Sequence, residues 1–202
     1  MKAVQNFVNK NHDSLIKFGG LFFMLLLIVV IPAHTEYTLR KQINAHLENE
    51  QNLRATVAEL NHQMDFYKTA YSKQQAIQQE VQCLAKNIYF EAATEPRAGK
   101  IAVAEVTMNR VKHGYASTVC GVVNQKNKGI CQFSWVCEPR KKITMISQWN
   151  EAKEIAENIL ISKKKYSTIQ GAVFFHADYV SPSWAETKDF IKQVGRHLFY
   201  KD

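Results

Sequence analysis

The sequence predicts an α+β domain, mostly helical with a small β-sheet, that follows a transmembrane helix and a long helical stalk. Three observations lead to this prediction. An uncharged apolar run covers residues 18–33, no proline or glycine interrupts residues 36–82, and turn residues with mixed helical and strand patterns begin after Val81. A chain of 202 residues is long enough for one well-packed core but not for two large ones.

The run FGGLFFMLLLIVVIPA, residues 18–33, is typical of an export signal or a membrane span. Three lysines precede it against a single acidic residue, which places residues 1–17 in the cytoplasm. We therefore predict a signal anchor over residues 18–35 of a single-pass protein of the cytoplasmic membrane, with the rest of the chain in the periplasm or outside the cell. Cleavage after Ala33 would instead release the chain, but the run has no A-x-A pattern, because a proline precedes that alanine.

Residues 36–82 contain no helix-breaking residue and predict a helical stalk. Apolar residues recur along it at spacings of four and three, the pattern of a coiled-coil seam. Glu50 and Gln74 interrupt this pattern where continued heptads require apolar side chains. A weak homodimer through the stalk and a plain spacer both fit. The seam consists of Leu53, Val57, Leu60, Met64, Tyr67 and Tyr71.

The remaining residues, 83–202, predict the globular domain. Periodic apolar positions predict three helices, over residues 83–92, 97–112 and 149–160. The first two are separated where Pro96 forces the preceding residue out of the helical region. Short aromatic runs bounded by turn residues predict two strands, over residues 131–136 and 172–177.

The net charge of +8 is concentrated in the globular part. Residues 84–202 carry 18 Lys and Arg against 11 Asp and Glu, while residues 1–83 carry 8 against 7. A basic domain suits an anionic partner such as nucleic acid, an acidic membrane surface or the acidic bacterial wall. Export across the membrane argues against nucleic acid. Short basic runs such as Arg140-Lys141-Lys142 are more typical of a solvated face.

Four cysteines, Cys83, Cys120, Cys131 and Cys137, lie in the globular part, and export places them where disulfides persist. Three pairings are open. We favour Cys131 with Cys137, which would close a short strand-and-turn loop, and Cys83 with Cys120. A zinc site is the rival interpretation, but no spacing is C-x-x-C and no histidine stands at a ligand-like offset.

The segment LAKNIYFEAATEPRAGKIAVAEVTMNRV places Glu91 inside an apolar helix, beside two aromatic residues. Partial desolvation raises the pKa of a carboxyl group, so Glu91 would keep a proton near neutral pH, as a general acid requires. Glu95 would add like-charge repulsion if the helix continued that far. The alternative is that Glu91 caps a helix or pairs with Lys86 or Arg97.

Other polar residues stand in apolar or aromatic surroundings. Asn109 lies in an apolar helix and needs hydrogen-bond partners, either within the fold or in a sugar acetamido group. Gln132 and Ser134 alternate with aromatic residues, a pattern of carbohydrate clefts and equally of packed sheets. His176 and Trp184, in and after the second predicted strand, either line a cleft or are structural.

Several other chemistries lack their motifs. The sequence has no G-x-S-x-G elbow, no phosphate-binding glycine loop and no H-E-x-x-H. Cysteine catalysis would need a reduced cysteine beside His176 or His113, which fits poorly with an exported domain that has four cysteines.

Six motifs follow one another from Cys83 to Tyr200: CLAKNIYFEAATEP, IAVAEVTMNRV, TVCGVVNQ, CQFSWVC, GAVFFHADYVSPSWA and GRHLFY. In order and approximate spacing they resemble the cell wall hydrolase family of the SleB type, named for spore-cortex-lytic enzymes. That family more usually has EARGEP where this chain has EAATEP. Ala93 and Thr94 therefore replace arginine and glycine beside the retained Glu91.

The resemblance implies a lysozyme-like or lytic-transglycosylase-like fold that cleaves peptidoglycan between N-acetylmuramic acid and N-acetylglucosamine. Glu91 then protonates the glycosidic oxygen and deprotonates the muramic acid 6-hydroxyl, closing an anhydro ring without an enzyme nucleophile. A muramidase would instead need a second carboxyl about 5 to 9.5 Å away. Glu95 and Glu105 are the candidates nearby in sequence, and Asp178 is a distant one.

The same resemblance makes six residues candidates for binding substrate around Glu91: Tyr89, Asn109, Gln132, Ser134, His176 and Trp184. Peptidoglycan is the expected partner, the cytoplasmic membrane the expected anchor, and no cofactor or metal is expected. Some family members carry the label N-acetylmuramoyl-L-alanine amidase, a reaction that often uses zinc. We rank it second because His176 has no evident ligand partners. A non-catalytic wall-binding protein, suggested by the altered EAATEP segment, is a further alternative.

Overall fold

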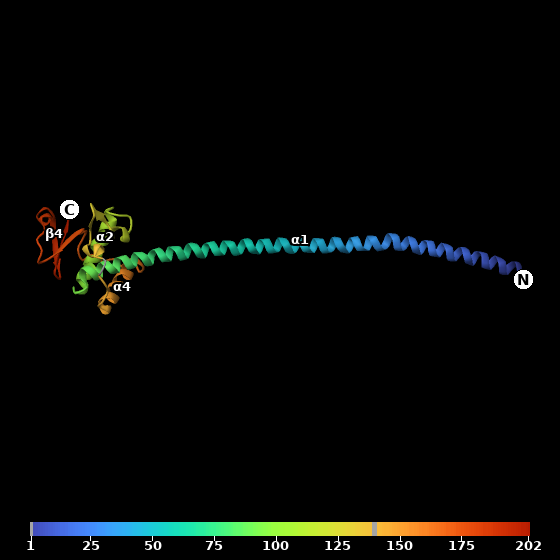
Figure 1. Cartoon of the computed structure of the whole chain (residues 1–202), viewed down its shortest axis with the longest axis horizontal. Coiled ribbons are helices and arrows are strands. Elements are labelled where there is room, and N and C mark those ends of the chain that lie inside the picture. The colour runs from blue at the N-terminus through green and yellow to red at the C-terminus, as the bar shows by residue number, and fades with distance from the viewer. Residues whose placement is uncertain (1, 139–140) are drawn as a thin grey trace. The chain divides into compact units, whose positions relative to one another are not determined.

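The computed structural model describes residues 2–138 and 141–202, with side chains from Gly19 onward (Figure 1). Pro139 and Arg140, the first residue of the basic run Arg140-Lys141-Lys142, lie outside the described residues. The chain divides into two compact units, Met1–Tyr67 and Lys68–Asp202. The prediction of a mostly helical α+β chain with small sheets is confirmed.

Helix α1, Lys2–Ala92, is one continuous helix that includes the predicted anchor and stalk. Pro32 lies inside it, and the Thr35 hydroxyl donates to the Pro32 carbonyl at 2.8 Å. The large apolar side chains of residues 21–31 are between 42% and 68% exposed. Within the described residues, one helix is long and apolar enough to cross a membrane, and its apolar part near the N-terminus is also what a signal sequence has.

The described residues of the second unit form three further α-helices and two short 3-10 helices: α2 (Arg97–Lys112), α3 (Val119–Val123), η1 (Ser134–Cys137), α4 (Ile146–Leu160) and η2 (Ser183–Thr187). Helix α1 ends before Pro96 and α2 begins after it, as predicted. The third predicted helix is confirmed as α4.

Two antiparallel sheets complete the second unit. The hairpin β1–β2 (Lys126–Asn127, Ile130–Cys131) turns at Lys128 and Gly129, both with positive φ, as a tight hairpin turn requires. The larger sheet has the order β3–β5–β4, with strands Phe174–Ala177, His197–Lys201 and Asp189–Val194. Strand β3 confirms the later part of the strand predicted over 172–177.

The other predicted strand, over residues 131–136, is wrong. Only Cys131 belongs to a strand, and Ser134–Cys137 form η1. A disulfide brings the Cα atoms of Cys131 and Cys137 to 6.0 Å, whereas six extended residues would span about 20 Å. The chain must therefore turn between the two cysteines, and the alternating polar and aromatic residues lie on a turn rather than on a sheet.

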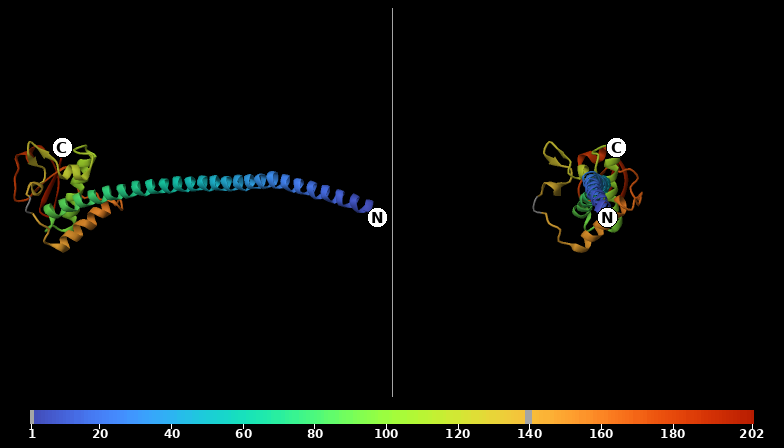
Figure 2. Two further views of the ribbon diagram at one scale, coloured as in Figure 1. Left: turned by 45° about the vertical axis from the view of Figure 1, so that its right-hand side comes forward. Right: turned by 90° about the vertical axis from the view of Figure 1, so that its right-hand side faces the viewer.

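Helix α2 lies between two buried apolar clusters. On one side, Leu84 of α1, Ala104 of α2 and Ile155 of α4 belong to the same cluster, and α4 runs beside the last turns of α1 (Figure 2). On the other side, Val106 packs with Phe199 of the central strand β5. Because α2 is covered on both sides, it fixes the end of α1 relative to the sheet.

The turn between β4 and β5 contacts the link between α1 and α2. Gly195 has φ +61, and a Cβ atom there would lie 2.0 Å from Glu95 Oε2. Glycine is therefore needed both for the backbone conformation and for the space. The Glu95 carboxylate accepts a hydrogen bond from the Arg196 backbone N–H at 2.9 Å, which ties the hairpin to the residues just after Glu91.

Candidate active site

A groove of about 320 Å³ contains the Glu91 side chain. Its walls come from the end of α1, from α2, from the η1 segment and from strands β3 and β5. Aromatic, basic and amide groups surround the single carboxyl. The lining residues are Phe90, Glu91, Arg110, Gln132, Phe133, Ser134, Lys141, Phe175, His176, Ala177, Tyr179 and His197.

Glu91 lies on the last turn of α1 and is half-buried. Removal from water raises the pKa of its carboxyl group from 4.5 to about 7, and the negative charge of Glu138 adds to the rise. Lys141 and Arg110 oppose the rise through their positive charges. In the described part of the chain, no hydrogen bond or ion pair reaches this carboxyl. It is therefore placed to exchange a proton near neutral pH.

Two expectations about the neighbours of Glu91 change. Glu95 does not add repulsion, because α1 ends at Ala92 and the Glu95 carboxylate binds Arg196 instead. Arg97 does not pair with Glu91, because its guanidinium binds Glu154 at 2.7 Å and Glu151 at 3.3 Å. Glu91 thus neither pairs with Arg97 nor caps a helix.

Arg110 supplies a buried positive charge beside the groove. Its side chain is on α2, its Nε donates to the Val173 carbonyl at 2.7 Å, and the guanidinium lies 5.4 Å from the ring centroid of Phe133. The Gln132 amide, with its oxygen turned toward Arg110, accepts from Nη1 at 3.0 Å and from Nη2 at 3.2 Å. These contacts fix Gln132 at the rim of the groove.

His176, on β3, has both ring nitrogens engaged. Nδ1 lies 2.9 Å from the Ala177 carbonyl oxygen, which can only accept, so Nδ1 carries the proton. In the neutral ring, Nε2 then accepts from the Tyr200 hydroxyl at 3.0 Å. Trp184 packs edge-on against both rings. His176 is therefore held in one orientation at the wall of the groove.

A buried amide supports the floor beside Glu91. Asn87 lies one helical turn earlier on α1 and is fully buried. Its Nδ2 donates to the Thr107 hydroxyl at 3.0 Å, and its Oδ1 accepts from Trp135 Nε1 at 3.2 Å. Trp135 in turn stacks on Phe90, with ring centroids 4.7 Å apart. These contacts hold η1 against the helix that carries the carboxyl.

The structure brings three of the six predicted substrate-binding residues to the groove and leaves three outside it. Gln132, Ser134 and His176 line it. Tyr89 is buried, and its hydroxyl oxygen accepts from the backbone N–H groups of Thr144 and Met145, at 3.0 and 3.1 Å, just before α4. Asn109 donates to the Ala172 carbonyl at 2.9 Å, the structural partner that the sequence left open. Trp184 lies behind His176.

Four polar groove residues were not singled out from the sequence: Arg110, Lys141, Tyr179 and His197. Arg110 could have been found by the same observation as Asn109, because both are polar residues in an apolar helix. Lys141 belongs to a basic run that we interpreted as a solvated face. His197 lies in the GRHLFY motif and is buried, which lowers the pKa of its ring. No pattern in the sequence indicated a role for Tyr179, since only the fold brings it to the groove.

The cysteines form the two pairs that we favoured from the sequence. Cys83 on α1 is joined to Cys120 on α3, and Cys131 to Cys137 across η1. The second bridge closes the loop that carries Gln132 and Ser134. Among the described residues, no group of three or more His, Cys, Asp or Glu side chains is arranged to hold a metal ion.

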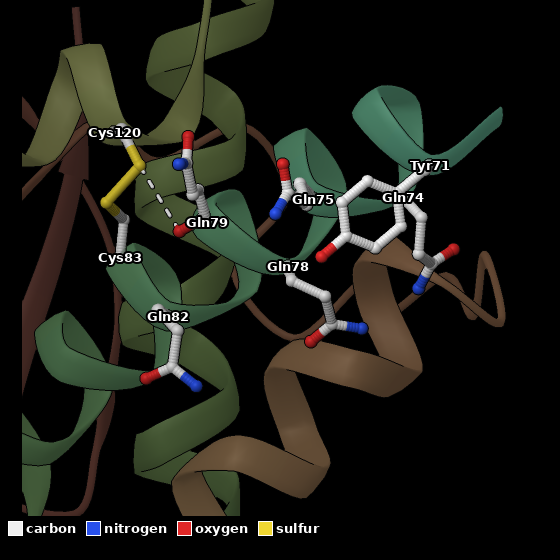
Figure 3. Close-up of a pocket in the computed structure, with 8 residues that line it drawn as sticks. All are labelled: Tyr71, Gln74, Gln75, Gln78, Gln79, Gln82, Cys83 and Cys120. Atoms are coloured by element: carbon white, nitrogen blue, oxygen red, sulfur yellow. Dashed lines mark hydrogen bonds between the residues drawn. A yellow bond between two sulfur atoms is a disulfide. The ribbon is translucent and has the colours of Figure 1, made fainter. Parts of the chain in front are cut away.

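A larger hollow, of about 670 Å³, lies on the surface of α1 next to the first disulfide (Figure 3). Its side chains point outward from successive turns of the helix and include five glutamines: Gln74, Gln75, Gln78, Gln79 and Gln82. Among the described residues that line it, none is a carboxylic acid, a histidine or a free cysteine. The groove at Glu91 is therefore the candidate active site despite its smaller volume.

A protein family described as Cell Wall Hydrolase matches residues 94–200, more than half of the chain. The chain belongs to the cell wall hydrolase family. The SleB-type resemblance seen in the sequence motifs is thereby confirmed. The family match begins just after Glu91, so it includes most groove residues but not the carboxyl itself.

Curated relatives of this family member are spore cortex-lytic enzymes. The enzyme of Oceanobacillus iheyensis is 31% identical over 130 residues, covering 61% of this chain and 42% of that protein. The enzyme of Bacillus cereus is 29% identical over 126 residues, covering 61% and 45%. The chain thus spans less than half the length of these relatives.

Two solved structures are also similar. The catalytic domain of the germination-specific lytic transglycosylase SleB from Bacillus anthracis is 27% identical, with a TM-score of 0.49, and 60% of this chain and 93% of that one are covered. The catalytic domain of Bacillus cereus SleB is 28% identical, with a TM-score of 0.48, covering 61% and 91%.

Proposed function

We propose that this chain is a lytic transglycosylase that cleaves peptidoglycan between N-acetylmuramic acid and N-acetylglucosamine, with Glu91 as the single acid and base. One observation carries the proposal. Among the described residues that line the groove, Glu91 is the one carboxylic acid, and its pKa is raised to about 7. Membership of the cell wall hydrolase family supports the substrate class.

The reaction needs one group that first gives and then takes a proton. Protonated Glu91 donates its proton to the glycosidic oxygen as the bond to the muramic acid C1 breaks. The resulting carboxylate removes the proton from the muramic acid 6-hydroxyl, whose oxygen bonds to C1 and closes the 1,6-anhydro ring. No water is consumed, and Glu91 is protonated again at the end. A pKa near 7 suits both halves of the cycle.

The positions of the other carboxylates favour this route over hydrolysis with a second carboxyl group. Glu95 accepts from Arg196 N–H, Glu105 accepts from Thr168 N–H at 3.0 Å, and Asp178 binds the Arg196 guanidinium at 3.3 Å. None of the three lines the groove in the described part of the chain. Glu138 is near enough to raise the pKa of Glu91, but it does not line the groove either. The described groove residues thus offer no second carboxyl as the nucleophile or base of a conventional glycosidase.

The remaining groove residues suit an acidic glycan. Arg110 and Lys141 place positive charge beside Glu91, which favours the carboxylates of the stem peptide. Phe90, Phe175 and Tyr179 offer aromatic faces, while Gln132 offers an amide for hydroxyl and acetamido groups.

We also propose the division of the chain that the sequence predicts. Residues 1–17 would be cytoplasmic, residues 18–35 the membrane anchor, residues 36–82 the stalk and residues 83–202 the cleaving domain. A tether of this kind would keep the domain at the wall without a separate binding module.

The experiment compares the full chain with its Glu91→Gln variant on purified sacculi, with mass spectrometry of the released muropeptides. We expect anhydromuramic ends from the parent protein and a loss of about 10²- to 10⁴-fold in the variant. Glu157→Gln, at an exposed position on α4, is the matched control and should retain full release.

The products separate the alternatives. Reducing sugar ends would show a muramidase, and freed stem peptides would show an amidase. Binding to sacculi without released products would show a wall-binding protein. Circular dichroism of both variants would confirm that the amide replacement leaves the fold unchanged.

A further inference from the structure

The first unit has an apolar stripe along α1 that is interrupted at His46 and Glu50. Counting heptads from Leu39 to Tyr67, seven of the nine core positions are apolar: Leu39, Ile43, Leu53, Val57, Leu60, Met64 and Tyr67. Each of these side chains is between 48% and 66% exposed. An exposed apolar stripe on a helix marks a surface that another molecule covers.

The residue types at these positions select the partner. In heptad notation Ile43 and Val57 are a residues, while Leu39, Leu53 and Leu60 are d residues. In parallel coiled coils, residues branched at Cβ in a positions with leucine in d positions favour two strands over three or four. We propose that residues 39–67 form a parallel, in-register, two-stranded coiled coil with a second copy of this chain.

The interrupted part of the stripe is consistent with this pairing. Glu50 occupies an a position, and its carboxylate binds the Arg54 guanidinium of the same helix at 2.6 Å. Each helix thus neutralises its own charge in this layer. His46 occupies the preceding d position. Two adjacent polar layers lower stability but define the register, because any shifted alignment buries them against apolar residues.

The flanking charges select the parallel orientation. In a parallel pair, each g residue faces an e residue of the second helix, so that neutral Asn49 faces Arg54 and neutral Thr56 faces Asn61. In an antiparallel pair, a residues pack against d residues, and in the alignment that places Val57 opposite Leu53 the two Arg54 side chains, at e positions, face each other. Like charges opposite one another disfavour that arrangement.

This inference is independent of the proposed activity, since the stripe lies in the first unit and the groove in the second. All four cysteines of the chain are in disulfides, so a single introduced cysteine provides a unique thiol. The test uses the full chain in detergent micelles with Leu60→Cys, at a d position. Ala55→Cys, at the outward f position, is the matched control.

Under mild oxidation, we expect the Leu60→Cys chain to form a covalent dimer on non-reducing gels, while the Ala55→Cys chain stays monomeric. A mixture of Leu60→Cys and Glu50→Cys chains distinguishes the orientation, because the antiparallel alignment above places position 50 opposite position 60. Preferential cross-linking between the two different chains would show an antiparallel pair and overturn the proposal. No cross-link, together with a monomeric mass by sedimentation, would overturn dimerisation altogether.

A second pair of variants measures affinity without chemical trapping. Leu60→Asp buries a charge in the seam and should weaken the dimer at least about tenfold by sedimentation equilibrium, whereas Ala55→Asp should leave it unchanged. Muropeptide release should persist in both. A monomeric parent chain that still cleaves peptidoglycan would contradict the coiled coil but not the proposed function. A dimeric parent chain without cleavage activity would contradict the proposed function but not the coiled coil.

Discussion

Glu91 gains its chemical character from the residues that pack around it rather than from a charged partner. Phe90, which stacks on Trp135, lines the groove with Glu91, and so does Arg110, itself buried and hydrogen-bonded to the backbone. Burial outweighs the two nearby positive charges, so the pKa of the carboxyl rises. A residue that holds its proton at neutral pH while facing a groove is equipped for acid catalysis.

The pH dependence of cleavage follows from this pKa. Because the first step needs protonated Glu91, kcat/KM should fall as pH rises through about 7, where the carboxyl ionises. The measurement is the rate of muropeptide release between pH 5 and 9. A rate that keeps rising above pH 8 would contradict the assignment of Glu91 as the acid.

Two variants should shift this pH dependence in opposite directions and so test whether Glu91 causes it. Lys141→Gln removes a charge that lowers the pKa of Glu91, so the alkaline fall should move to higher pH. Glu138→Gln removes a charge that raises it, so the fall should move to lower pH. Shifts in the same direction would mean that the fall reports another group.

At the scale of elements, Tyr89 joins helices α1 and α4. Its hydroxyl oxygen accepts from two backbone N–H groups just before α4, which lowers the pKa of the phenol. A helix start leaves its first N–H groups without intrahelical partners. The hydroxyl therefore takes the place of a side-chain cap, since Met145 makes none at this end of α4.

We expect Tyr89→Phe to lower the free energy of unfolding by about 1–3 kcal/mol, because two part-buried backbone donors lose their acceptor. Tyr166→Phe is the matched control, since its hydroxyl is buried without a partner in the described part of the chain. Denaturant unfolding of both variants tests the difference. Equal stability in the two variants would argue against this capping role.

At the scale of the whole second unit, the two disulfides close loops of very different length. Cys83 and Cys120 are 37 residues apart, and Cys131 and Cys137 are 6 apart. Loop-closure entropy assigns about 4 kcal/mol to the longer loop and about 2.5 kcal/mol to the shorter one. The longer bridge joins α1 to α3, whereas the shorter one shapes the rim of the groove.

Replacing each pair by alanine should separate these roles. Cys83→Ala with Cys120→Ala should lower Tm more, by the larger entropy of the open loop. Cys131→Ala with Cys137→Ala should lower Tm less but reduce cleavage more, because Gln132 and Ser134 lose their constraint. Thermal scans and muropeptide release measure the two effects, and the opposite ranking of Tm would contradict the loop argument.

Local patterns in the sequence determined helices α1, α2 and α4, the break at Pro96, the later part of strand β3 and the family of this chain. Each of these depends on residues close together in the sequence, where apolar period, proline and motif order act directly. Glu91 was recognisable for the same reason, since an acid inside an apolar helix is a local anomaly.

Only the tertiary structure decided what surrounds that acid. It brought Gln132, His176 and His197 to the groove, moved Tyr89 and Asn109 out of it, and turned the predicted strand at 131–136 into η1. These outcomes depend on a disulfide, on helix α2 packed on both sides, and on backbone carbonyls far away in sequence. Contacts between distant residues leave no periodic trace in the chain, so a polar residue in an apolar helix predicts a buried partner without identifying which one.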